Sequence, residues 1–341
     1  MCLNFTLELV LEFDMLIDNH NREINYVRLA VTDRCNLRCN YCMPAEGINF
    51  AKKDTLFSID ELSRLSKILV SQGVDKIRIT GGEPFVRKDL MVLFRSLSEM
   101  DGLKDISVTT NATLIGPYID ELKELGIKNI NVSMDAINRE TFERITRRNQ
   151  YDTVYNNMIR LITEGFNVRI NFIALQGQNT DDILPMLELT KHYEVSVRFL
   201  EEMPFNGGSK TFDSIVWDYK RILEYIKNAY PDYRMLESPK TSTSINYQIP
   251  GFKGTFGVIP SFSRTFCGTC NRLRISATGD VITCLYAKAS MNIRDILRSE
   301  NSEEKVKEQI LKAVGSRAKT GFEAQQKYDG VFDNSMTSIG G

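Results

Sequence analysis

Six of the seven cysteines in this 341-residue chain form two triplets of different spacing. The triplets are Cys35, Cys39 and Cys42, spaced C-x3-C-x2-C, and Cys267, Cys270 and Cys284, spaced C-x2-C-x13-C. Three ligands are an odd number for disulfide pairing and one short of a closed tetrahedral zinc site. Three thiolates suit a cubane iron–sulfur cluster that leaves one iron for another ligand. The spacing therefore predicts two open-sited 4Fe-4S clusters, with a structural zinc knuckle as the alternative at the first triplet.

Composition limits what else the chain could bind. It has 43 basic and 44 acidic residues, which gives no reason to expect a nucleic acid or a membrane surface as partner. An anionic ligand would have to be held by locally clustered arginines. Residues 1–14, including Cys2, lack a basic segment and a cleavage site, and we interpret them as an upstream extension. Clustered cysteines without an export signal predict metal binding in a reducing cytoplasm.

Short apolar runs alternate with helical stretches between residues 24 and 202, which predicts a parallel α/β sheet, either a partial barrel or a doubly wound sheet. The expected strands are residues 24–31, 76–80, 105–111, 129–135, 167–175 and 195–202. The expected helices between them are 58–72, 88–100, 117–126, 138–164 and 181–193. In such folds, active groups collect at the carboxyl ends of the strands. The first triplet, Gly81–Pro84, Asn111 and Asp135 all lie at such ends.

The pattern changes after Met203, which predicts a second, smaller domain. Residues 204–210 are rich in turn formers, and a helix is expected at 216–229, a hairpin at 271–284 and a helix at 301–314. The expected division is a barrel domain at 15–205, a C-terminal domain at 206–325 and a tail at 326–341.

The first triplet with its context resembles the radical S-adenosylmethionine superfamily, because an aromatic residue, Tyr41, precedes the last cysteine just after the first strand. That resemblance implies a partial TIM-type (β/α)6 barrel whose first cluster binds S-adenosylmethionine. It further implies that Tyr41 covers the adenine, and that Gly82 and Glu83 of the TGGEP sequence meet the amino group. Ser133 and Met203 match family positions near the adenosyl moiety, although each alone would more often be a packing residue.

The second triplet resembles the auxiliary-cluster domain of the molybdenum cofactor biosynthesis protein A family, the GTP 3′,8-cyclases. Arg272 and Arg274 follow its second cysteine at alternate positions of a strand, so both face the same side and suit a phosphate chain. An ordinary solvated hairpin is the alternative. The resemblance implies GTP contacts at Arg28, Arg78, Thr109, Arg169, Arg272, Leu273 and Arg274. Arg28, Arg78 and Arg169 could instead form buried ion pairs. The resemblance leads us to expect lysine at position 169, so the arginine there departs from the family pattern.

The chain ends in Gly340 and Gly341, which resembles the Gly-Gly tail that reaches the active site in that family. Two residues without side chains can enter a channel that a larger residue would block. A frayed terminus is the alternative, as for most chains.

Taken together, the resemblance implies an enzyme that converts GTP to 3′,8-cyclo-7,8-dihydro-GTP in molybdenum cofactor biosynthesis. Its expected cofactors are two 4Fe-4S clusters and S-adenosylmethionine. Its expected partners are a low-potential electron donor, a downstream cyclic pyranopterin monophosphate synthase and a second copy in a homodimer. One alternative is a peptide-modifying radical enzyme, although such enzymes commonly have more C-terminal cysteines and lack the R-x-R and the Gly-Gly tail. Another is a non-catalytic electron-transfer or scaffold protein, which would leave the GGEP turn unexplained.

Overall fold

The computed structural model describes residues 15–44, 46–203, 216–327 and 335–339. The predicted extension with Cys2, the turn-rich linker at 204–210 and the terminal Gly340 and Gly341 lie outside the described residues.

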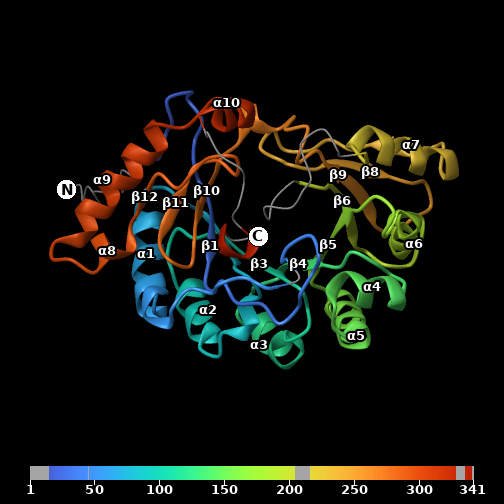
Figure 1. Cartoon of the computed structure of the whole chain (residues 1–341), viewed down its shortest axis with the longest axis horizontal. Coiled ribbons are helices and arrows are strands. Elements are labelled where there is room, and N and C mark those ends of the chain that lie inside the picture. The colour runs from blue at the N-terminus through green and yellow to red at the C-terminus, as the bar shows by residue number, and fades with distance from the viewer. Residues whose placement is uncertain (1–14, 45, 204–215, 328–334, 340–341) are drawn as a thin grey trace, which may run out of the picture.

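Six parallel strands pair in chain order and form the barrel part of the sheet (Figure 1). They are β1 (Tyr26–Ala30), β2 (Lys76–Thr80), β3 (Asp105–Thr110), β4 (Asn129–Ser133), β5 (Asn167–Ala174) and β6 (Ser196–Glu201). All six predicted strands are confirmed, each shortened by no more than two residues at either end. Parallel strands place all their carboxyl ends at one edge of the sheet, which is where the sequence predicts the site.

Helices cover the outer face of these strands, from the left of Figure 1 along the bottom to the right. They are α1 (Ile59–Ser71), α2 (Leu90–Ser98), α3 (Ile119–Glu124), α4 (Arg139–Thr146), α5 (Tyr151–Thr163) and α6 (Ile183–His192). The predicted single helix at 138–164 is wrong, because α4 ends at Arg147, whose φ of 56° is left-handed. α5 then starts after a short turn. Helix α1 begins with the predicted capping box, in which Ser58 and Glu61 each accept from the other's backbone N–H.

The C-terminal part continues the same sheet at both edges. Its strands are β7 (Arg234–Met235), β8 (Ile245–Gln248), β9 (Thr255–Ile259), β10 (Arg272–Ile275), β11 (Asp280–Ile282) and β12 (Met291–Asn292). β10 pairs in parallel with β1, and β9 pairs in parallel with β6, so the six barrel strands leave no open edge. The helices here are α7 (Tyr219–Ala229), α8 (Arg294–Leu297), α9 (Ser302–Gly315), α10 (Gly321–Gln326) and α11 (Met336–Ile339). The fold is thus a partial TIM-type barrel with a smaller C-terminal part.

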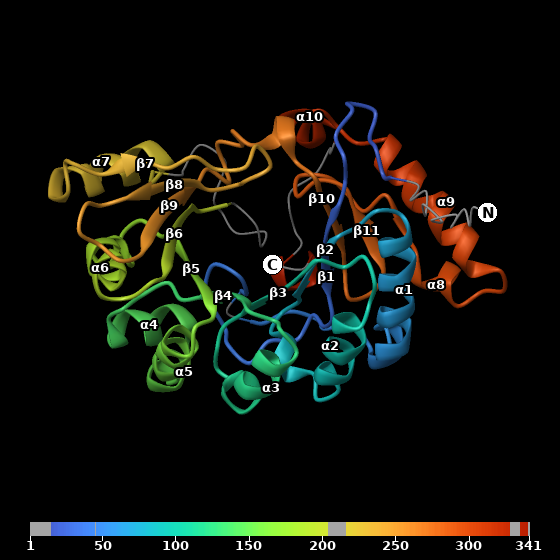
Figure 2. The same cartoon turned by 180° about the vertical axis from the view of Figure 1, so that it is seen from behind.

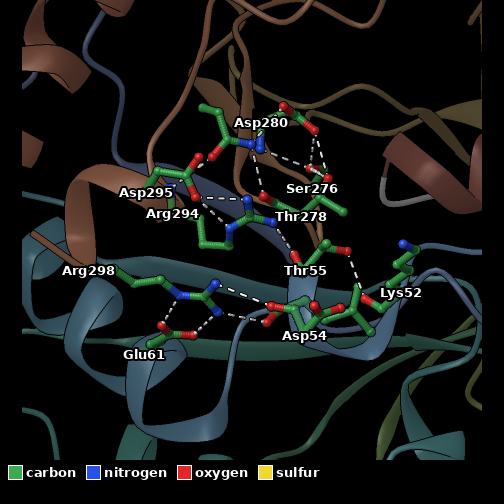
Figure 3. Close-up of polar contacts among 12 residues, drawn as sticks. Lys52, Asp54, Thr55, Glu61, Ser276, Thr278, Asp280, Arg294, Asp295 and Arg298 are labelled. Carbon is green, nitrogen blue, oxygen red and sulfur yellow. Dashed lines mark hydrogen bonds and ion pairs between the residues drawn. The ribbon is translucent and has the colours of Figure 1, made fainter.

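Arginines at and just after α8 fasten the C-terminal part to the start of α1 (Figure 3). Arg298 donates to both carboxylate oxygens of Glu61, at 2.5 and 3.1 Å, and to the carbonyl oxygen of Leu56. Arg294 donates to the carbonyl oxygen of Thr55. The hydrogen bonds from Arg298 lower the pKa of Glu61 below its ordinary value, against the opposing effect of partial burial. These contacts hold β10 to β12 beside the barrel.

Within the described ranges, no helix has both the length and the apolar character needed to cross a membrane.

Candidate active site

A cavity of about 660 Å³ lies at the carboxyl ends of the barrel strands, between the barrel and the C-terminal part. All six triplet cysteines line it, although the two triplets are separated by more than 200 residues in the chain. They meet because β10, which follows Cys270, pairs with β1, which precedes Cys35. The pairing of these two strands therefore brings the two predicted metal sites into one space.

The first triplet lies on a single loop after β1. The backbone N–H groups of Cys42 and Met43 donate to the carbonyl oxygen of Cys39, at 3.0 and 2.9 Å, which folds the loop tightly. Burial raises the pKa of Cys35, and it raises the pKa of Cys42 to about 12. Burial also raises the pKa of Cys39, and the nearby Asp135 raises it further. These thiolates would thus have to be stabilised by a bound metal group or another cation.

The TGGEP turn packs against the start of the cysteine loop. A Cβ atom at Gly82 would lie 2.3 Å from the carbonyl oxygen of Arg34, and one at Gly81 would lie 2.4 Å from that of Thr32. Only glycine allows this approach, and both glycines line the cavity. The turn therefore fixes the cysteine loop and also presents backbone to a ligand.

Glu83, predicted to meet a ligand's amino group, lies directly beside the cavity, and its contact with a ligand stays a prediction. Its side chain is fully buried and is not among the groups that line the cavity. Its carboxylate accepts from the backbone N–H groups of Phe85 and Asn111, at 3.1 and 2.6 Å, and from the hydroxyl of Thr110 at 2.8 Å. Burial raises the pKa of Glu83 to about 7. The carboxylate thus organises the turn, and a direct role remains open to Gly82 and Glu83.

The residues predicted near the adenosyl moiety face the same cavity as both triplets, and Met203 packs with Tyr286 and Cys284 on the side of the second triplet. Tyr41, Ser133 and Met203 all line the cavity. The hydroxyl of Tyr41 donates to Asp135 at 2.6 Å, and the other oxygen of Asp135 accepts from the backbone N–H of Ile173 at 2.8 Å. Burial raises the pKa of Asp135 to about 6. This hydrogen-bonded pair fixes the Tyr41 ring, and its role toward a ligand stays a prediction.

Two buried arginines hold the loop of the second triplet by its backbone. Arg22 donates to the carbonyl oxygen of Cys267 at 2.9 Å, and Arg317 donates to those of Cys270 and Arg272 at 3.2 and 2.6 Å. Asp18 pairs with both arginines, at 2.6 and 3.4 Å. We call Asp18, Arg22 and Arg317 the clasp. It joins the segment before β1 to the segment after α9 around the second triplet.

Arginines beside the second triplet alter the pKa of one of its cysteines. Burial raises the pKa of Cys267, and it raises the pKa of Cys284 to about 11. Burial would also raise the pKa of Cys270, but Arg317 and Arg272 outweigh it and lower that pKa below the ordinary value. This contrast with the first triplet follows from the neighbouring arginines.

Six strand arginines line the cavity together: Arg28, Arg78, Arg169, Arg198, Arg272 and Arg274. Arg28 lies opposite Arg274 on one neighbouring strand and opposite Arg78 on the other, as alternation along the strands predicts. Burial lowers the pKa of Arg274 to about 10. Leu273, which the resemblance also implies as a GTP contact, differs from these arginines. Its side chain is buried in the core, so only its backbone could contact a ligand.

The aromatic ring of Tyr26 lies close to several cationic side chains that line the cavity. Its ring centre lies 5.5 Å from the guanidinium carbons of both Arg78 and Arg272, and 5.3 Å from the Lys76 ammonium. The negative face of an aromatic ring attracts cations, which offsets part of their mutual repulsion. Burial would raise the pKa of Tyr26, but Arg78 and its neighbours lower it below the ordinary value.

Several polar atoms that line the cavity have no protein partner in the described part of the chain. They are Thr80 Oγ1, Thr109 Oγ1, Asn131 Oδ1, Asn171 Oδ1, Arg28 Nε and Arg198 Nε, all buried. Buried polar groups in native proteins nearly always have a partner, so this concentration indicates a polar ligand.

Sequence reasoning missed Arg198, Asn131 and Asn171 in the cavity, as well as the clasp. Arg198 carried the same signal as Arg28, an arginine within an apolar strand. Burial lowers its pKa to about 9, with Arg169 contributing next. The clasp carried no local signal, because Arg317 lies almost 300 residues from Asp18 and Arg22 in the chain.

The C-terminal segment reaches the first triplet. The Ser335 hydroxyl donates to the carbonyl oxygen of Cys42 at 2.7 Å, and Met336 and Thr337 line the cavity. Figures 1 and 2 both show α11, in red, at the middle of the molecule. The prediction that Gly340 and Gly341 enter the site concerns residues just beyond this segment.

Comparisons with known proteins agree with this geometry. A profile of the radical SAM superfamily matches residues 29–190, and a profile described as Molybdenum Cofactor Synthesis C matches residues 195–322. The GTP 3′,8-cyclase of Alkaliphilus oremlandii (strain OhILAs) is 37% identical over 95% of this chain and 99% of its own length. This chain belongs to the GTP 3′,8-cyclase family.

Other relatives of this family are longer. The molybdenum cofactor biosynthesis protein 1 of Drosophila melanogaster is 38% identical over 88% of this chain, which spans only 53% of that protein. The chain thus spans about half the length of several curated relatives that it matches. A solved structure of Streptococcus suis SuiB bound to S-adenosylmethionine has a TM-score of 0.61 at 16% identity, covering 87% of this chain and 69% of that one. That likeness supports the barrel fold.

The cavity fits the cofactors of the family, S-adenosylmethionine and two 4Fe-4S clusters. Each triplet offers three free thiols, and neither histidine of the chain lines the cavity. His20 instead contacts the carbonyl oxygen of Arg317 at 3.1 Å. Among the described residues, no three ligating side chains gather as a single metal ion would need. A cubane spreads its thiolates further apart, because each binds a different iron.

Proposed function

We propose that this chain is a GTP 3′,8-cyclase, a radical S-adenosylmethionine lyase that converts GTP to (8S)-3′,8-cyclo-7,8-dihydroguanosine 5′-triphosphate in the first step of molybdenum cofactor biosynthesis. The observation that carries the proposal is a single cavity lined by both cysteine triplets and by six strand arginines. Its support from the relatives is a protein of that name that this chain covers almost completely.

The cofactors supply the difficult chemistry, and the protein positions the substrate. When bound at Cys35, Cys39 and Cys42, the first cluster with S-adenosylmethionine supplies a radical that removes hydrogen from the substrate. Gly82, Tyr41 and Ser133 line the cavity beside these cysteines and are proposed to hold S-adenosylmethionine.

The arginines are proposed to bind the triphosphate. Guanidinium groups bind phosphate through two parallel N–H donors and keep their charge when partly desolvated. Arg28, Arg198 and Arg272 each have a buried N–H without a protein partner in the described chain, and all three line the cavity. Once the triphosphate is held there, the ribose and base extend toward the rest of the same cavity. Holding the reacting carbons at a fixed distance supplies the entropic part of catalysis.

Polar side chains between the two ends are proposed to orient the nucleoside. Thr109, Asn131 and Asn171 have buried oxygens without protein partners in the described chain, and they suit ribose hydroxyls or base amino groups. Met203, Phe142 and Met336 add apolar surface that excludes water from the reacting centre.

The reaction also requires a low-potential one-electron donor. From the family resemblance we further propose that the protein is a homodimer in the cytoplasm. Its product would then be the substrate of a cyclic pyranopterin monophosphate synthase.

Anaerobic reconstitution with iron, sulfide, S-adenosylmethionine and GTP, followed by product identification, tests the proposal. The expected products are 5′-deoxyadenosine and the cyclised nucleotide in equal amounts. Deoxyadenosine formation with intact GTP would favour the peptide-modifying alternative. Absence of deoxyadenosine from a fully reconstituted protein would favour the non-catalytic one.

A further inference from the structure

A group of arginines lies on the outer side of the loop that carries Cys35, Cys39 and Cys42. Arg144 is at the end of α4, Arg147 and Arg148 follow in the next turn, and Arg38 lies within the cysteine loop. Arg144, Arg147 and Arg148 are exposed, and Arg38 is half-buried. We call these four residues the arginine patch.

The arginine patch is joined directly to the cysteine loop. The backbone N–H groups of Arg38 and Asn40 donate to the carbonyl oxygens of Thr146 and Ile145, each at 3.0 Å. The Arg147 guanidinium donates to the carbonyl oxygen of Met43 at 3.3 Å. The blue loop after β1 lies beside α4 in both Figure 1 and Figure 2. The patch thus adjoins the backbone that holds Cys39 and Cys42.

Most of the hydrogen bonds that the patch makes within the described residues go to backbone carbonyl oxygens. Arg38 donates to those of Cys35 and Leu37, Arg144 to that of Gln178 at 2.7 Å, and Arg148 to that of Arg147. Arg144 also lies near enough to Asp182 to oppose the rise that burial gives the pKa of that carboxyl. Within the described ranges, none of the four forms an ion pair with a carboxylate.

Neighbouring arginines on the same helices behave differently. Arg139 of α4 pairs with Asp152 and Glu143, and Arg160 of α5 pairs with Asp120 and Glu164 at 2.7 Å each. The chain carries a net charge of −1, so the patch is a local excess of positive charge and not part of a basic surface overall. One exposed acid, Glu46, lies in the same loop.

We infer that the arginine patch is the docking surface for an acidic one-electron carrier protein that reduces the iron–sulfur group at the first triplet. This inference rests on the proposed function, since that reaction needs such a donor. Redox encounters are brief and bury little surface, so complementary charge is what brings the partners together and orients them. The step moves one electron and no atoms: the carrier is oxidised by one electron, and the group held by Cys35, Cys39 and Cys42 is reduced by one.

The test reverses charge on the patch in the reconstituted, full-length protein. The variant R147E/R148E changes the charge by four units, and K305E/K312E, on exposed lysines of α9, is the matched control. Helices α4 and α9 lie at opposite ends of the molecule in Figure 1. Flavodoxin serves as the acidic carrier, and its affinity for each protein is measured by calorimetry, where the patch variant should bind more weakly than the parent and the control should not. Deoxyadenosine formation is then measured with reduced flavodoxin, and again with dithionite or reduced methyl viologen, two small reductants of opposite charge.

We expect the flavodoxin-driven rate of R147E/R148E to fall about tenfold or more at low salt, and the loss to shrink as salt screens the charges. R147Q/R148Q should fall less. Both small reductants should still drive the variant within about twofold of the parent, which shows that the site is folded and active. Equal flavodoxin-driven rates in variant and parent, or an equal fall in K305E/K312E, would overturn the inference. No deoxyadenosine from the parent protein with any reductant would instead contradict the proposed function.

Discussion

The two cysteine triplets share one cavity but lie among opposite charges. Around the first triplet, Asp135 raises the pKa of Cys39 beyond the effect of burial, and Glu83 does the same for Cys35. Around the second triplet, Arg317 and Arg272 lower the pKa of Cys270 in spite of its burial. Within the cavity, the first triplet therefore lies beside carboxylates and the second beside arginines, and we call the side of the second triplet the electropositive end; none of the four residues of the arginine patch lines this cavity.

The difference indicates what each end can bind. S-adenosylmethionine carries a sulfonium and an ammonium group, which are stabilised beside carboxylates and thiolates. GTP, the proposed substrate, carries a triphosphate, which the arginines of β1, β2, β5, β6 and β10 would stabilise. A continuous cavity with opposite charge at its two ends would therefore orient both molecules without any large motion.

Replacing one cysteine of each triplet should have the largest effect, and it tests whether the two triplets have different roles. We expect Cys42→Ala to abolish formation of deoxyadenosine and of product. Cys270→Ala should abolish product but retain some deoxyadenosine formation that is uncoupled from GTP. Each variant should lose about four irons per chain, because a cubane holds four. Iron analysis and chromatography of both products measure this, and identical product profiles in the two variants would contradict unequal roles.

Truncating an arginine at the electropositive end should have the next largest effect. Arg198→Ala removes a buried guanidinium, so we expect kcat/KM for GTP to fall by roughly 100-fold, in the range of one or two charge-assisted hydrogen bonds. KM for S-adenosylmethionine should change little. Arg234→Ala, on the exposed strand β7, is the matched control. An equal rise in both KM values would show that the two ends are not separate.

The clasp offers a third test, confined to the second triplet. Asp18→Asn leaves Arg22 and Arg317 buried without a counter-charge, so we expect the free energy of unfolding to fall by about 2 kcal/mol. The second cluster should be lost more readily than the first on exposure to a chelator, as followed by iron content and electron paramagnetic resonance. Asp120→Asn removes an exposed partner of Arg160 and should cost less than about 1 kcal/mol. If both clusters were lost at the same rate, the clasp would not act specifically on the second triplet.

The smallest effect concerns the attachment of the C-terminal part in Figure 3. Because Arg298 lowers the pKa of Glu61, the carboxylate stabilises the fold above its ordinary pKa, and that contribution is lost as the pH falls through the lowered value. We expect Glu61→Gln to lower stability at pH 7 by less than about 1 kcal/mol, because the pair is partly exposed. Urea unfolding at pH 7 and at pH 3 should show this difference shrinking at the lower pH. A constant difference would mean that the charge of Glu61 is not involved.

The sequence was enough to predict the parts of the site that follow local rules. Alternation along the strand placed Arg272 and Arg274 on one face, and parallel pairing put the first triplet at the carboxyl edge, whereas Arg28 and Arg78 were named from the family resemblance. The break between α4 and α5 was missed because helical periodicity continues through Arg147, and only its left-handed backbone ends the helix. Helices and strands are local patterns, whereas this break depends on the contacts around the turn.

Long-range contacts could not be predicted from such patterns. The clasp joins Asp18 to Arg317, and no local spacing specifies that pairing. Glu83 was predicted as a ligand contact because of its motif, and the motif gave no sign of the three hydrogen bonds by which its carboxylate also organises the turn. A buried carboxylate can stabilise a turn and still have acceptor sites left for a ligand.

A crystal structure of the reconstituted protein, grown without oxygen and with both S-adenosylmethionine and GTP, would test the central claim most directly. We predict S-adenosylmethionine beside Cys35, Cys39 and Cys42, with the triphosphate of GTP on Arg28, Arg198 and Arg272. Binding of the triphosphate outside this cavity, or beside the first triplet, would contradict the account.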